Sequence, residues 1–167
     1  MSELLDATVE IAASAERVWG VLCDFVSYPE WNPFITSVEG KIRRGARLTI
    51  HIATPGHPAI AIHTRLLKVR RGRELSWRGQ VLAPGMLDGE HSFVIEPLAA
   101  ERCRVRQQAA HFSGVLAPML LPGLLENTRR GFEAMNLALK QRAENSFPIV
   151  FNDTSTEKSA APTTNRP

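Results

Sequence analysis

Residues 88–97 read D-G-E-H-S-F-V-I-E-P, and this stretch decides the fold class of the 167-residue chain. Apolar and polar side chains alternate along it: one face carries His91 and Phe93, and the other carries Glu90 and Ser92. A period of two residues is typical of a β-strand with one buried face. The stretch therefore predicts a strand whose inner face packs against a core.

Shorter segments of the same kind lie on both sides of this strand. They predict further strands at residues 5–11, 37–43, 47–53, 60–69, 74–82 and 102–112. Because only short turns separate the later strands, they form an antiparallel meander. Between the first two strands, Ser14 is a good N-cap for a short helix ending near Asp24. The stretch F-V-S-Y-P-E-W-N-P at 25–33 then predicts a second short helix or turn, because its prolines forbid a long element.

The end of the chain carries a different period. From Gly123 onward, apolar side chains recur at spacings of three and four, which predicts a helix that ends near Asn145. The fold class is therefore α+β, with a curved antiparallel sheet of about six to seven strands wrapped around a long C-terminal helix, and two short helices after the first strand. Residues 1–145 form one domain, and residues 146–167, rich in Ser, Thr and Pro, are predicted to be a disordered tail.

Composition excludes several classes of protein. The net charge is +3, and the basic residues near 41–47, 68–73 and 102–106 are interpreted as solvated strand edges and hairpin tips, with a weak contact to an anionic surface as the alternative. We expect no nucleic-acid partner. Cys23 and Cys103 are predicted to be free buried thiols, and no metal-type spacing appears. Without a signal peptide or an apolar run of ~18 residues, we expect a cytoplasmic protein without stable membrane insertion.

Several motifs, taken in order, resemble the START-like (SRPBCC) superfamily and its helix-grip fold. They are the pattern from Ala13 to Asp24, Y-P-E-W-N-P at 28–33, L-x-W-x-G at 75–79, G-x-H-x-F-x-I-x-P at 89–97, and F-S-G at 112–114. They look most like the polyketide cyclase/dehydrase and lipid-transport branch, over about residues 3 to 144. The resemblance implies this fold and a small hydrophobic ligand, without a cofactor. It does not fix the function, because one fold hosts unrelated activities.

A strongly curved sheet does not close fully on a straight helix, so we expect an apolar pocket between them. The expected ligand-binding residues comprise inward strand positions, helix positions and two residues at the mouth: Ile50, Ile62, Trp77, His91, Phe93, Val105, Gln107, Ala109, Leu121, Leu125, Phe132, Arg129 at the rim, Trp31 and Met119. Trp77 and Phe93 serve equally well as plain core, because the wall of such a pocket is the core.

His91 and Gln107 are polar residues on faces that otherwise look apolar. A buried polar group needs a partner, so either they hydrogen-bond within the protein, with each other for instance, or they anchor a polar group of a ligand. His91 is the weak candidate for a catalytic acid or base, since its ordinary pKa lies near neutrality. Glu90 and Asp88 point to the opposite face. His111 shares the inward face, but if residue 91 pairs with about residue 107 it lies roughly 13 Å away.

Three hypotheses of function follow. The first is a carrier for a lipid, a sterol-like compound or an aromatic polyketide. The second is a cyclase or dehydratase that uses polar residues of the same pocket. The third is a regulatory interaction domain, for which the outer surface matters more than the pocket. A homodimer is compatible with each of them.

Overall fold

The computed structural model describes residues 5–54, 57–81, 87–115 and 117–145. Within them, seven strands form one antiparallel sheet in the order β1-β7-β6-β5-β4-β3-β2. This confirms the predicted sheet. Its strands are β1 (Leu5–Ile11), β2 (Ile35–Gly40), β3 (Arg47–Thr54), β4 (His57–Arg70), β5 (Glu74–Val81), β6 (Leu87–Ala99) and β7 (Arg102–Ser113).

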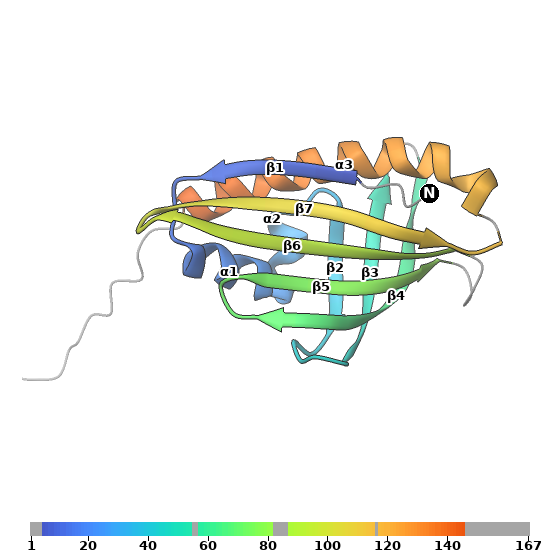
Figure 1. Ribbon diagram of the computed structural model, residues 1–167, viewed down its shortest axis with the longest axis horizontal. Coiled ribbons are helices and arrows are strands. Elements are labelled where there is room, and N and C mark those ends of the chain that lie inside the picture. Colours follow the sequence, from blue (N-terminus) through green and yellow to red (C-terminus); the bar gives the residue numbers. More distant parts are fainter. Residues whose placement is uncertain (1–4, 55–56, 82–86, 116, 146–167) are drawn as a thin grey trace, which may run out of the picture.

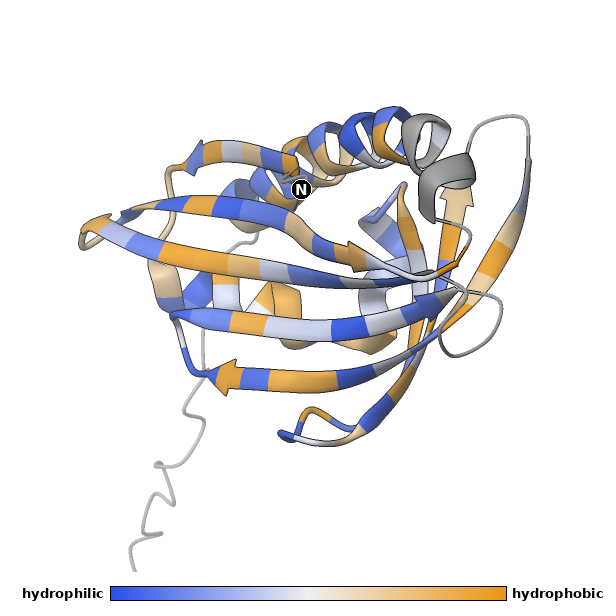
Figure 2. Ribbon diagram, turned by 45° about the vertical axis from the view of Figure 1, so that its right-hand side comes forward, coloured by the Kyte–Doolittle hydropathy of each residue, from blue (hydrophilic) through white to orange (hydrophobic). Residues whose placement is uncertain are grey.

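The sheet is strongly bent. Figure 1 shows β1, β6 and β7 running along the length of the molecule, whereas β2 and β3 run across it. Register shifts between Leu66 and Lys68 in β4 and at the β6–β7 pair mark bulges, which increase twist and bend a sheet locally. Apolar and polar residues alternate along the strands in Figure 2. One face of the sheet is thus apolar and covers the core.

Two short helices follow β1, as predicted: α1 (Ala15–Cys23) and, after a single 3-10 turn, α2 (Tyr28–Trp31). The side chain of Ser14 caps α1 by accepting a hydrogen bond from the Arg17 N–H at 3.2 Å. The buried hydroxyl of Tyr28 donates to the carbonyl oxygen of Leu22 at 2.7 Å. This bond fixes α2 against the end of α1.

The long helix α3 (Ala117–Asn145) packs along β1 and also contacts β7 and α1. It begins six residues before Gly123, the predicted start. Pro118 does not prevent this, because it lies in the first turn, where a backbone N–H has no partner within the helix. Two hydrogen bonds join the C-terminal end of α3 to the end of β1 and the residue that follows it. Glu144 accepts from the Ala12 N–H at 2.7 Å, and Lys140 donates to the Glu10 carbonyl oxygen at 2.9 Å.

The inward position predicted for His111 is wrong. His111 has a φ of +57° and is exposed, and the pairing of Glu90 with Ala110 changes to Asp88 with Ser113 around it. One extra residue therefore sits in β7 at this point. The bulge turns His111 outward and places Phe112 on the inner face.

No helix in the described ranges is long and apolar enough to cross a membrane. Cys23 and Cys103 are both free, and only Cys103 is fully buried. Desolvation raises the pKa of the Cys23 thiol to about 11, so neither its position nor its ionisation favours reactivity. The tail predicted at 146–167 lies outside the described residues.

Candidate ligand-binding site

A partly open cavity of about 100 Å³ lies between the inner face of the sheet and α3. Apolar side chains form most of its wall, contributed by β2–β5, β7 and α3. They are Phe34, Ile35, Ile50, Ile52, Ile62, Trp77, Ala109, Phe112 and Phe132. The cavity is thus built where the bend of the sheet keeps β2 and β3 away from the helix.

Asn32 positions the part of the wall that comes from the start of β2. Its side-chain oxygen accepts hydrogen bonds from the N–H groups of Phe34 at 3.0 Å and Ile35 at 2.9 Å. The Phe34 ring lies directly on Gly131 of α3, where an added Cβ would come within 2.2 Å of it. The same ring meets Phe132 edge-on, with centroids 5.9 Å apart. The Asn32 turn and Gly131 together let Phe34 close the cavity against the helix.

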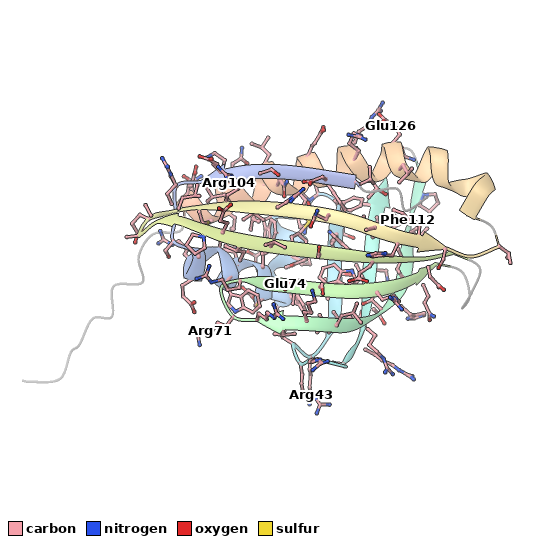
Figure 3. The ribbon with its side chains drawn as sticks, in the orientation of Figure 1. Arg43, Arg71, Glu74, Arg104, Phe112 and Glu126 are labelled. Carbon is pink, nitrogen blue, oxygen red and sulfur yellow. The ribbon has the colours of Figure 1, made fainter. Side chains whose placement is uncertain are left out.

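Two glycines form a flat area on the opposite wall. Gly79 and Gly89 are directly paired across β5 and β6 and both line the cavity. The ring of Phe112 lies over Gly89, 3.0 Å from where a Cβ would stand. The bulge at His111 is what brings Phe112 to this place. Figure 3 shows Phe112 near the end of β7.

His91 lies in an aromatic cluster. Its ring stacks on Phe132, with centroids 4.7 Å apart and planes 13° apart, and it also contacts Trp77 at 4.9 Å and Phe93 at 4.7 Å. Desolvation lowers the pKa of His91 to about 3. Although part of the residue is accessible from the cavity, its Nε2 atom is buried. The imidazole is therefore neutral at physiological pH.

Three polar side-chain atoms around the cavity are buried without a hydrogen-bond partner among the residues described. They are Thr64 Oγ1, Asp88 Oδ1 and His91 Nε2. Buried polar groups in folded proteins are nearly always paired, and leaving one unpaired costs about 1–3 kcal/mol. Five other buried polar atoms of the described residues also lack a partner and lie on residues away from the cavity, so Thr64 and His91 are distinguished by their place on the inner wall.

Six of the residues predicted for the site line the cavity: Ile50, Ile62, Trp77, His91, Ala109 and Phe132. Phe93, Val105 and Gln107 do not line it, because they are fully buried further along the strands. Gln107 pairs with Phe93 in the register, and its side-chain N–H donates to Met135 Sδ at 3.3 Å. His91 and Gln107 therefore do not bond to each other.

The remaining predicted residues lie elsewhere. Trp31 contacts Tyr28 edge-on, Leu125 packs against the core, and Arg129 is exposed; none of the three lines the cavity. The side chains of Met119 and Leu121 lie outside the described residues. Ten further residues line the cavity that the sequence did not indicate: Phe34, Ile35, Ile52, Thr64, Gly79, Asp88, Gly89, Glu90, Phe112 and Thr128.

A signal was available for Thr64, which has the same parity as Ile62 on a strand of period two. For Phe112 the alternation was misleading, because the bulge in β7 changes its relation to β6. Asp88 borders the cavity but keeps the outward position that the alternation predicts, since it pairs with Gln80 in an unbroken register with β5.

The volume limits the kind of guest. Pockets for drug-sized molecules usually hold roughly 300–1,000 Å³, whereas an engineered apolar cavity of about 150 Å³ binds benzene. At about 100 Å³, this cavity holds about one ring of a guest, and the rest of a larger guest would extend through its open side. The planar surroundings of His91, Trp77 and Phe132 favour an aromatic guest.

A curved sheet closed by a long helix over an apolar cavity defines a helix-grip ligand-binding fold. The chain belongs to the polyketide cyclase / dehydrase and lipid transport family, whose model matches residues 4–144. This confirms the START-like resemblance. Among curated proteins, none matches the chain.

Solved structures share the fold at low sequence identity. The Zhui aromatase/cyclase from Streptomyces sp. R1128 is 22% identical, with a TM-score of 0.70 over 86% of this chain and 94% of that one. A START superfamily protein from Mycobacterium smegmatis is also 22% identical, with a TM-score of 0.67 over 84% and 97%. Norcoclaurine synthase from Thalictrum flavum, in complex with dopamine and hydroxybenzaldehyde, is 13% identical, with a TM-score of 0.56 over 82% and 87%.

Proposed function

We propose that this chain binds a compact aromatic molecule carrying a hydroxyl or carbonyl group, in the cavity between the sheet and α3. The observation that carries the proposal is the pair of unpaired polar atoms on two inward-facing residues, Thr64 and His91, in a mostly apolar wall. The apolar wall supplies affinity, at roughly 25 cal/mol per Å² of ligand surface buried before the costs of ordering. The polar atoms supply orientation.

The family supports a small-molecule ligand, since its description covers both lipid transport and polyketide chemistry. A single-ring guest is also supported by a relative of the same fold, because norcoclaurine synthase is seen with dopamine and hydroxybenzaldehyde. A cytoplasmic location is consistent with the two free thiols. The homodimer stays a prediction.

A cyclase or dehydratase reaction in the same cavity is the second candidate. It is favoured by the presence of a hydroxyl and an imidazole, on Thr64 and His91, on the inner wall of one cavity. However, a general base works best when its pKa lies near the working pH, and the pKa of His91 is about 3. We therefore assign His91 to hydrogen bonding rather than to proton transfer. A rate on a poly-β-ketone mimic that falls in His91→Ala would reverse this assignment.

The binding proposal is tested with two one-ring probes, 4-fluorophenol and fluorobenzene, titrated into the full chain and followed by fluorine NMR. We expect 4-fluorophenol to bind about three- to tenfold more tightly, because one hydrogen bond contributes about 0.5–1.5 kcal/mol. Thr64→Val removes the cavity hydroxyl at nearly constant volume and should reduce the difference in affinity between the two probes. Thr49→Val, on the outer face of β3, is the matched control and should leave it unchanged. If neither probe binds the wild-type chain at millimolar concentration, the proposal is wrong.

A further inference from the structure

Three arginines form a row across the outer face of the sheet, on the side away from the cavity. Arg47 of β3 is paired directly with Arg65 of β4, and Arg65 is paired directly with Arg78 of β5. Like charges directly opposite each other on neighbouring strands destabilise a sheet. Such a row therefore lowers the stability of the protein without a ligand, and a bound anion would remove that repulsion.

Few ion pairs neutralise the positive charge of this row. Arg78 lies 3.6 Å from a carboxylate oxygen of Glu90, and its side chain is 58% exposed. No carboxylate among the residues that the structure describes lies within the 4.0 Å of an ion pair from Arg47 or Arg65. Two of the three guanidinium groups thus lack an ion pair among the described residues, although the carboxylate of Glu39 lines the hollow that these arginines surround.

The other half of the same face is built differently. Arg104 of β7 pairs with Glu10 at 2.8 Å and with Glu96 at 3.1 Å, and Arg106 pairs with Asp6. Figure 3 shows Arg104 where β1, β6 and β7 run side by side. The sequence has the same asymmetry: residues 39–80 hold 10 of the 20 Lys and Arg but only 2 of the 17 Asp and Glu. Positive charge is therefore concentrated over β2–β5.

The row also has a shape that admits a ligand. The three arginines line a hollow of about 780 Å³ on the outer face, together with Thr49, His63 and Gln80, and with one carboxylate, Glu39 of β2. A guanidinium binds a phosphate through two parallel hydrogen bonds, and the hydroxyl and amide groups add neutral donors. Two strand steps separate the outer arginines by about 10 Å, a span that flexible arginine side chains close around a diphosphate-sized anion.

We propose that this outer hollow binds a phosphate-bearing molecule through Arg47, Arg65 and Arg78. The phosphate chemistry is common to two sources, a soluble phosphate ester and a phospholipid headgroup. The three arginines lie on the face of the sheet opposite the cavity, and Thr64 is the residue that lines both hollows. The site also gives the positive charge of β2–β5 a role other than solubility.

The test measures binding of pyrophosphate by calorimetry, and of vesicles containing phosphatidic acid by co-sedimentation, for the full chain and two variants. Arg65→Gln removes the central member of the row. Arg104→Gln makes the same charge change at a position that already has acidic partners. We expect the first variant to weaken binding by about tenfold or more and the second to stay within about twofold. Without phosphate, the Tm of Arg65→Gln should equal or exceed that of the wild type, because the repulsion is relieved.

Each outcome decides the proposal. Pyrophosphate binding that depends on Arg65 supports it and identifies a soluble phosphate as sufficient. Vesicle binding that depends on Arg65, without pyrophosphate binding, supports it and identifies the headgroup as the source. Equal weakening by both variants would reduce the effect to net charge and overturn the proposal. If the wild-type chain binds neither pyrophosphate nor the vesicles, the proposal is also overturned.

Discussion

Burial of a neutral His91 makes the stability of this protein depend on pH in a specific way. The pKa of His91 is about 3 in the folded chain, compared with about 6.5 for an unperturbed histidine. Between these values the unfolded chain binds a proton that the folded chain does not. The contribution is therefore fully present above about pH 7 and is lost progressively as the pH falls from 6.5 towards 3.

The size of the effect follows from the same two values. A pH of 5 lies about 1.5 units below the pKa of His91 in the unfolded chain, and each unit corresponds to 1.36 kcal/mol. The free energy of unfolding should therefore fall by about 2 kcal/mol between pH 7 and pH 5. Other shifted groups act at lower pH, because the pKa values of Glu10 and Glu144 are lowered by their basic partners. His91 should thus dominate the change between pH 7 and pH 5.

Urea unfolding at pH 7, 6 and 5 measures this contribution. His91→Phe keeps an aromatic ring in the cluster but removes the titration, so its free energy of unfolding should change by about 2 kcal/mol less than that of the wild type over this range. His63→Gln, at an exposed position on the outer face, is the control, and its free energy of unfolding should depend on pH as that of the wild type does. If wild type and His91→Phe lose the same free energy, the imidazole is not desolvated and the account of the cluster is wrong.

Three further predictions concern the walls of the cavity. Gly131→Ala forces the Phe34 ring away from α3, and it should lower the free energy of unfolding by about 1–3 kcal/mol in urea titrations, whereas an unchanged value would show that the contact is loose. Asn32→Ala removes the acceptor of two backbone N–H groups and should cost about 1–3 kcal/mol by the same assay; a loss under 0.5 kcal/mol would contradict its role. His111→Val places a β-branched residue at a φ of +57° and should lower stability by about 1–2 kcal/mol in thermal melts, and a higher Tm would argue against the bulge.

The sequence was sufficient to predict the sheet, the short helices and the final helix, because period two and period 3.6 are strong over residues 5–11, 88–97 and 125–139. It was not sufficient for the register of β6 and β7. Pairing His91 with Gln107 or with Ala109 differs by two residues, and a shift of two keeps every side chain on the same face. Alternation therefore cannot distinguish these registers. The observed pairing is with Ala109.

The bulge explains most of the remaining differences at the site. His111 and Phe112 continue the alternation of β7 in sequence, and His111 is not the glycine that usually marks such a position. Only the pairing with β6 shows that His111 is the extra residue and that Phe112 faces the cavity. The contribution of Phe34 was also hidden, because it depends on contact with Gly131, nearly a hundred residues away along the chain.

The affinity of 4-fluorophenol for a chain whose cavity has been filled shows whether a guest binds between the sheet and α3. Ala109 lines the cavity, and Ala110 faces the other side of the sheet. Ala109→Leu therefore adds three carbon atoms inside a space of about 100 Å³. Ala110→Leu adds the same three atoms outside it. With both variants folded by circular dichroism, we expect Ala109→Leu to weaken binding by about tenfold or more, equivalent to about 1.4 kcal/mol, and Ala110→Leu to leave it unchanged. Equal affinity in all three proteins would mean that the probe binds elsewhere and that the cavity between the sheet and α3 is not the binding site.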